Sequence, residues 1–118
     1  MADRVAASIT IGGIIHADDY ITLCRLIAEE DLSVEEGGDS FTPADRTEGQ
    51  PLRLFDHQAI GGQFKALEAW CIDHGLAFSR WCAGYTGSWQ AERVVFTGEG
   101  FAEVYPANEK GAVVATLD

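Results

Sequence analysis

Two short segments combine histidine with aspartate, the side chains that most often carry acid–base and metal chemistry. The first holds His16, Asp18 and Asp19, and the second holds Asp56 and His57. Each segment comes where a predicted strand gives way to a predicted helix. If these two strands are parallel neighbours joined by a crossover, both junctions lie at the same edge of the sheet, where the ligands of open sheets gather.

That convergence would suit a small acid–base enzyme or a metal-dependent binding protein. Its catalytic residues would be His16, Asp19 and His57, with Asp19 orienting an imidazole or ligating the metal. Asp18 and Asp56 also have a structural explanation, because an aspartate at a helix N-cap contributes about 1 kcal/mol. Neither segment has a recognised metal-ligand spacing, so a purely structural role stays open for both.

The three cysteines, Cys24, Cys71 and Cys82, predict no disulfide framework, because they are odd in number and widely spaced. Cys71, His74 and Cys82 offer only three of the four ligands that a closed zinc site needs. We interpret Cys71 as a buried apolar residue and His74 as a residue that favours the negative end of a helix dipole. The sequence therefore predicts no metal and no cofactor.

Acidic residues dominate the charge. The net charge is −11, and residues 29–48 hold eight acidic side chains against one arginine. Such a field repels phosphate backbones and anionic lipids, so we expect neither nucleic acid nor a membrane as partner. It has two open explanations: a solubilising surface, or a docking face for a basic protein.

Two segments could present binding residues. Residues 35–51 are rich in Gly, Pro, Asp and Thr and long for a connection, which indicates a mobile acidic loop or a binding loop carrying Glu35, Glu36 and Asp39. Residues 81–89 interleave aromatic residues with glycine and serine, and we expect Tyr85 to be exposed there. The structural alternative is that the two tryptophans of that segment pack at the edge of the core.

The elements that must position these residues follow from hydrophobic spacing. Strands are predicted over 4–11, 52–55, 76–82, 92–97, 101–105 and 112–116, and helices over 18–31 and 57–74. Gly75 supplies a stop for the second helix. The glycine pair Gly61-Gly62 costs a helix roughly 0.5–1 kcal/mol per residue, which indicates either close backbone approach or a later helix start.

This order, β-α-loop-β-α-β-β-β-β, predicts an α+β two-layer sandwich. We expect a mixed sheet that ends in an antiparallel meander, with both helices on one face. The predicted core consists of apolar residues on the inward faces of these elements: Ile9, Ile11, Leu23, Ile27, Leu54, Phe64, Leu67, Cys71, Val94 and Phe96.

The chain is 118 residues long, which predicts one domain over 1–118. Its start shows no basic segment followed by an apolar one, and with its unpaired cysteines this favours a cytoplasmic location. We therefore expect a small acidic, non-catalytic module that binds a protein partner, basic partners being favoured, or that self-associates as a homodimer. The enzyme or metal-dependent protein described above is the alternative.

Overall fold

The computed structural model describes residues 4–12, 17–34, 41–42, 51–60, 63–84 and 91–107. Of Arg4, His57, Gln58 and Ile60 it describes the backbone alone. The elements, in chain order, are β1 (Arg4–Ile11), α1 (Ala17–Glu30), β2 (Leu52–Ile60), α2 (Lys65–Asp73), β3 (Phe78–Cys82), β4 (Glu92–Phe96) and β5 (Glu103–Pro106). The predicted strand over 112–116 lies outside the described residues.

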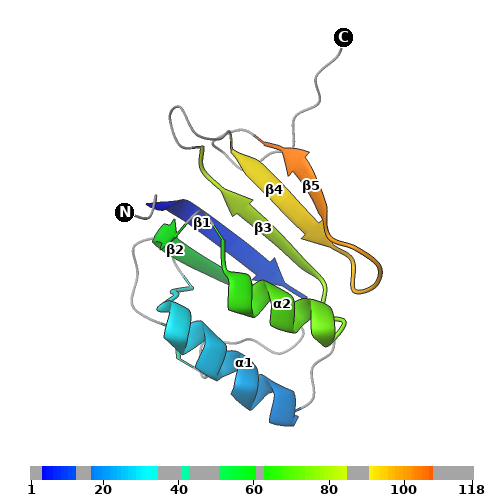
Figure 1. Ribbon diagram of the computed structural model, residues 1–118. Helices are drawn as coiled ribbons and strands as arrows, with labels where there is room; N and C mark the ends of the chain where they lie inside the picture. The colour runs from blue at the N-terminus through cyan, green and yellow to red at the C-terminus, as the bar shows by residue number, and fades with distance from the viewer. Residues whose placement is uncertain are drawn as a thin grey trace.

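The five strands form one sheet in the order β2-β1-β3-β4-β5, with β1 next to the centre. Both helices pack on one face of this sheet, over β2, β1 and β3, while β4 and β5 extend to the side away from α1 (Figure 1). The α+β class and the element order are confirmed. In the described part of the chain, no helix is long and apolar enough to cross a membrane.

The sheet differs from the expected mixed sheet, because every pairing between described strands is antiparallel. The expectation of parallel first strands is wrong: β2 begins with Leu52 opposite Ile11, the last residue of β1. The long connection after α1 therefore returns the chain to the end at which β1 finishes. On the way, Ser33 pairs with Phe55 through two backbone hydrogen bonds of 3.1 and 2.8 Å, which covers part of the outer edge of β2.

Because β2 and β3 both run antiparallel to β1, they run in the same direction on either side of it. Helix α2 connects them and crosses over β1 (Figure 1). This helix starts at Lys65 and not near residue 57 as predicted, because residues 56–60 continue β2. An irregularity in the pairing with β1 between Val5 and Ala7 shifts the register there, and Ala59 is buried.

Both helices end in the same way. After α2, Gly75 has a φ of +65°, and the Leu76 N–H donates to the Cys71 carbonyl (2.9 Å). After α1, Asp31 takes a φ of +54°, and the Leu32 N–H donates to the Ile27 carbonyl (3.4 Å). These are Schellman motifs, which satisfy the last carbonyls of a helix and turn the chain back over it. The predicted stop at Gly75 is confirmed.

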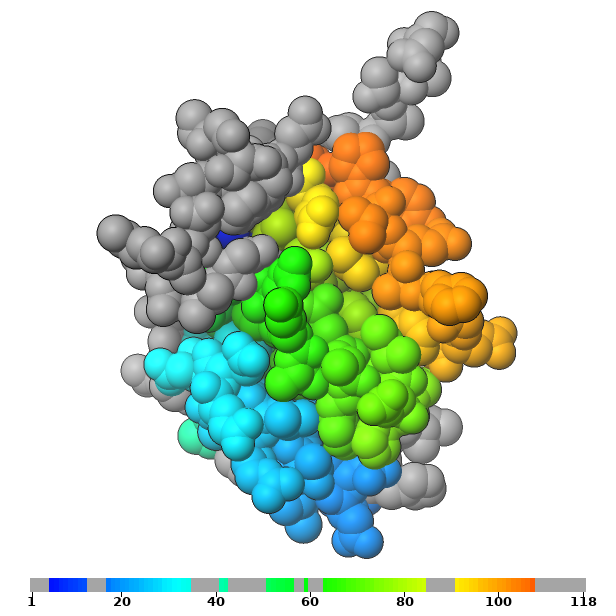
Figure 2. All heavy atoms as spheres, in the orientation of Figure 1, coloured from blue at the N-terminus to red at the C-terminus, as the bar shows by residue number. Residues whose placement is uncertain are grey.

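The core lies between the helices and the sheet. All ten residues predicted to form it are buried. Leu32 and Phe41, which belong to the connection after α1, join them, and the Phe41 N–H donates to the Leu32 carbonyl (2.7 Å). In the space-filling view α1 and α2 lie side by side over this core, and β5 is visible beyond α2 (Figure 2).

Leu67 tests the assignment of the buried face of α2, since its side chain is fully buried. We expect Leu67→Ala to lower the free energy of unfolding by about 2–5 kcal/mol, through lost burial and a residual cavity. Ile72→Ala is the matched control on the same helix, because Ile72 is exposed. Urea denaturation measures both, and equal losses in the two variants would contradict this packing.

Candidate functional site

The structure does not bring the two histidine–aspartate segments to one edge. Asp19 lies in the first turn of α1, beyond the end of β1, whereas His57 lies inside β2. Since Leu52 is opposite Ile11, His57 is five residues further along β2, or roughly 17 Å at about 3.4 Å per residue. His16 and the side chain of His57 lie outside the described residues. The catalytic roles of His16 and His57 stay predictions, and the parallel pairing of the first two strands that suggested them is not found.

Asp56 occupies a strand, so its expected role as a helix N-cap is wrong. The N-cap of α2 is Phe64, whose side chain makes no capping hydrogen bond. The backbone N–H of Phe64 donates instead to Glu68 Oε2 (2.8 Å), one turn into the helix. Asp18 lies within the first turn of α1, where a carboxylate is favourable at the positive end of the dipole.

Asp19 lies beside a different imidazole, that of His74 at the C-cap of α2, with 4.0 Å between Nε2 and Oδ1. His74 Nδ1 is 2.9 Å from the Trp70 carbonyl oxygen, and the two rings stack with centroids 4.1 Å apart. The pair joins the start of α1 to the end of α2. Both side chains are more than a third exposed, so the contact contributes at most about 1 kcal/mol.

The two cysteines near His74 in sequence are structural. Burial, followed by the charge of Glu68, raises the pKa of Cys71 to about 12. Burial also raises the pKa of Cys82, although Arg80 acts in the opposite direction. Thiols with raised pKa values are poor nucleophiles and poor metal ligands. Within the described ranges, no group of three or more His, Cys, Asp and Glu residues is arranged to hold a metal ion.

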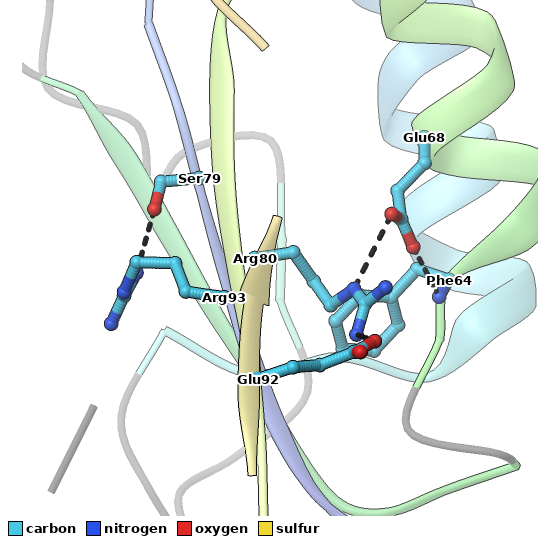
Figure 3. Close-up of polar contacts among 6 residues, drawn as sticks. All are labelled: Phe64, Glu68, Ser79, Arg80, Glu92 and Arg93. Atoms are coloured by element: carbon cyan, nitrogen blue, oxygen red, sulfur yellow. Dashed lines mark hydrogen bonds and ion pairs between the residues drawn. The ribbon is translucent and has the colours of Figure 1, made fainter. Parts of the chain in front are cut away.

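A buried arginine connects the two layers. Arg80 of β3 is only 3% exposed, and its neighbours along the inward face of the strand, Phe78 and Cys82, are also buried. Its Nε lies 3.3 Å from Glu68 of α2 and its Nη1 lies 3.2 Å from Glu92 of β4 (Figure 3). The sequence analysis did not identify this network. The alternation of the predicted strand over 76–82, which turns Arg80 inward, is the signal that could have found it.

Carboxylates gather beside this network at the C-terminal end of α1. Burial raises the pKa of Glu30, and the charges of Asp56, Glu68 and Glu29 raise it further. The last turn of α1 contains no basic residue, and Asp31 follows it directly. We call Glu29, Glu30, Asp31 and Asp56 the acidic face.

The acidic face unites two segments that are far apart in the sequence, since α1 and β2 are separated by the connection after α1. It also lies at the negative end of the α1 dipole, where carboxylates are destabilising. The expected binding residues Glu35, Glu36 and Asp39 follow α1 closely in sequence, but they and Tyr85 lie outside the described residues. The acidic face is therefore defined by the described acids alone.

No protein-family model, no curated protein and no solved structure matches the chain.

Arg80 tests the network. Arg80→Met leaves Glu68 and Glu92 as partly buried charges, so we expect a loss of about 3–5 kcal/mol in the free energy of unfolding. Adding Glu68→Gln and Glu92→Gln removes those charges, and this triple variant should recover much of the loss. Urea denaturation compares the three proteins. A triple variant no more stable than Arg80→Met would show that the ion pairs are not the cause.

Glu30 tests the cost of the acidic face. Its pKa in the folded protein is raised above the ordinary value of 4.5, so folding favours the protonated acid. The contribution of Glu30 to stability is therefore complete below about pH 4.5 and is lost as the pH rises through the raised pKa. We expect Glu30→Gln to increase the free energy of unfolding at pH 7 by about 0.3–1 kcal/mol, and to have little effect near pH 3.5.

Thermal unfolding at several pH values measures this dependence. Glu99→Gln is the control, because Glu99 is exposed and lies in the turn between β4 and β5. An equal gain in both variants at pH 7 would reflect net charge alone and contradict a local cost at Glu30.

Proposed function

We propose that the protein is a small non-catalytic interaction module that binds a basic protein partner through its acidic face. The observation that carries this proposal is the grouping of carboxylates from α1, α2 and β2 around Glu30, whose pKa is raised by burial and by these charges. The raised pKa means that the ionised form of Glu30 is destabilised in the folded protein. A partner that presents lysine or arginine side chains would offset this destabilisation on binding.

Solubility alone does not require such an arrangement. Acidic residues serve solubility equally well when they are dispersed or placed at helix N-termini, as Asp18 is. Here three acids lie together at the wrong end of a helix, and a fourth reaches them from β2. Local rules of stability are most often broken at functional sites, where the cost serves binding.

The groups that shift the pKa of Glu30 all raise it. Arg80, which pairs with the neighbouring Glu68, is also paired with Glu92. Glu29 and Asp31 are exposed at the end of α1, where a basic partner can reach them.

The overall charge supports the same partner chemistry. A net charge of −11 attracts a basic protein over distances beyond direct contact and speeds its association, and the effect falls as salt is added. The same field disfavours nucleic acids and anionic membranes. No described contact favours the alternative of an acid–base or metal-dependent enzyme at His16, Asp19 and His57.

Charge-neutralised variants test the proposal in affinity capture with the full chain as bait. Glu29→Gln with Glu30→Gln should weaken retention of the captured basic protein about ten-fold, or about 1.4 kcal/mol. A loop variant, Glu35→Gln with Glu36→Gln and Asp39→Asn, measures the contribution of the predicted binding loop. The control is Asp73→Asn with Glu99→Gln, which removes two exposed charges elsewhere.

The affinity of the retained protein for each bait is then measured over a range of salt concentrations. We expect weaker binding at higher salt, and a shallower dependence for the acidic-face variant than for the control. Retention that is equal in all the variants, or indifferent to salt, would refute the electrostatic mechanism.

A further inference from the structure

The face of the sheet opposite the helices, which we call the outer face, has its own pattern of side chains. Arg93 and Ser79 lie on it, on the other side of the sheet from Arg80 and the helix layer (Figure 3). The strand registers extend it over all five strands as two rows of outward side chains. The first row is Arg53, Thr10, Ser79, Val95 and Glu103, and the second is Phe55, Ser8, Trp81, Arg93 and Tyr105. None of these side chains is buried, and Arg53 and Glu103 are exposed.

Each row has residues at its two ends that can bind one another. The first row has Arg53 on β2 and Glu103 on β5, and the second has the aromatic residues Phe55 and Tyr105 on the same two strands. The Tyr105 hydroxyl donates to Glu103 on this face. The centre of both rows is β3, the middle strand of the sheet. A rotation of 180° about β3 therefore exchanges the arginine end with the glutamate end.

Two arginines make the outer face unusual in this acidic chain, which has 19 acidic and 8 basic side chains. The Arg53 guanidinium lies over the Phe55 ring, 5.1 Å from its centroid, and Arg93 Nη1 donates to Ser79 Oγ (2.6 Å). Burial, followed by the charge of Arg53, lowers the pKa of Arg93. The fold thus holds two like charges on one face, where a carboxylate from another molecule would stabilise them.

We propose that the outer faces of two copies of the chain pack against each other, about a two-fold axis that runs along β3. Arg53 of each copy then meets Glu103 of the other, and Phe55 meets Tyr105. Packed sheets lie about 10 Å apart with their strands nearly aligned, a distance that an arginine and a glutamate side chain span together. A twisted sheet keeps its saddle shape under this rotation, so the two faces are also complementary in shape.

Charge complementarity is the reason for choosing a second copy and this direction of the axis. An axis perpendicular to the strands would place β2 over β2 of the other copy and bring the two Arg53 residues together. The axis along β3 instead makes every contact twice, with opposite charges facing each other.

The size of the outer face determines the strength of the dimer. At about 4.8 Å per strand and about 3.4 Å per residue, five strands of five residues cover about 400 Å² on each copy. The two copies together therefore bury less than the roughly 1,200 Å² of the smallest stable complexes, so the dimer is weak and reversible.

The inference concerns a different surface from the acidic face. Asp56 of the acidic face is opposite Ala7, whose side chain is buried in the core, so Asp56 belongs to the helix side of β2. A basic partner can bind there while the outer faces are paired. Failure of one proposal therefore leaves the other unaffected.

Sedimentation velocity on the full chain tests the dimer over about 10 μM to about 1 mM, where weak complexes form. We expect the average mass to rise with concentration from 12.8 kDa toward twice that value. A chain that stays monomeric at the highest concentration would overturn the proposal. Binding of a poly-glutamate peptide by such a monomer would assign the outer face to an acidic partner instead.

Charge reversal tests the contact between Arg53 and Glu103. Arg53→Glu brings glutamates together and Glu103→Arg brings arginines together, so each should weaken self-association about ten-fold. The double variant restores opposite charges and should return to within about three-fold of the natural chain. Because the single variants change the net charge in opposite directions, net charge alone cannot weaken both. Arg25→Glu, on the exposed side of α1, is the control and should have little effect.

Circular dichroism verifies that all the variants keep the fold, and nuclear magnetic resonance gives a readout that needs no variant. The indole N–H of Trp81, close to the axis, should shift as the concentration rises, while that of Trp70 on α2 does not. A double variant no better than the single ones, or an unchanged Trp81 signal, would each overturn the proposal.

Discussion

The buried guanidinium of Arg80 is the constraint on which the arrangement of the two layers depends. A cation this deep in the protein must be held by carboxylates, because an unpaired buried charge costs several kcal/mol. Arg80 meets Glu68 from the helix layer and Glu92 from the neighbouring strand. Glu68 has a second task, since its other oxygen accepts the Phe64 N–H at the start of α2. One carboxylate thus starts the helix and attaches it to the sheet, which determines where α2 lies along β3.

The same carboxylate shapes the electrostatics around it. Glu68 raises the pKa of Cys71 one turn further along α2 and that of Glu30 across the contact with α1. Arg80 is shared with Glu92, so its charge is divided between two acids. Glu68 therefore links the ion pairs of Arg80 to the carboxylates at the end of α1.

Local sequence patterns predicted the elements well, and long-range pairing decided the rest. The alternation over 4–11 and the helical spacing from Tyr20 to Ile27 mark β1 and α1, and the left-handed glycine after α2 marks its end. The prediction of a helix over residues 57–60 is wrong: Ile60 continues the apolar spacing of Phe64 and Leu67, although Gly61-Gly62 indicates a later start of the helix. Pairing with β1 holds them in a strand.

Residue spacing alone could predict neither the direction of β2 nor which residues form the candidate site. β2 runs antiparallel to β1 because the connection after α1 returns the chain to the end at which β1 finishes. No sequence motif in that connection indicates this direction. The contact between Asp19 and His74 requires α1 to pack against α2, and the grouping of Glu30 with Asp56 requires the whole sheet to be in place. Residues that meet only through tertiary packing leave no periodic trace in a single sequence.

The topology also explains why β5 is the least covered strand of the described sheet. α2 crosses between β2 and β3, so the helix layer covers those strands and β1. β4 is held to β3 by the ion pair of Glu92 with Arg80 and by the packing of Phe96 against Phe78. The close approach of Gly75 and Gly98 attaches the turn after β4 to the end of α2. Among the described residues β5 has no comparable contact: it pairs with β4, and its residues are mainly exposed. A strand whose described contacts come mainly from pairing with one neighbour is among the least protected parts of a fold.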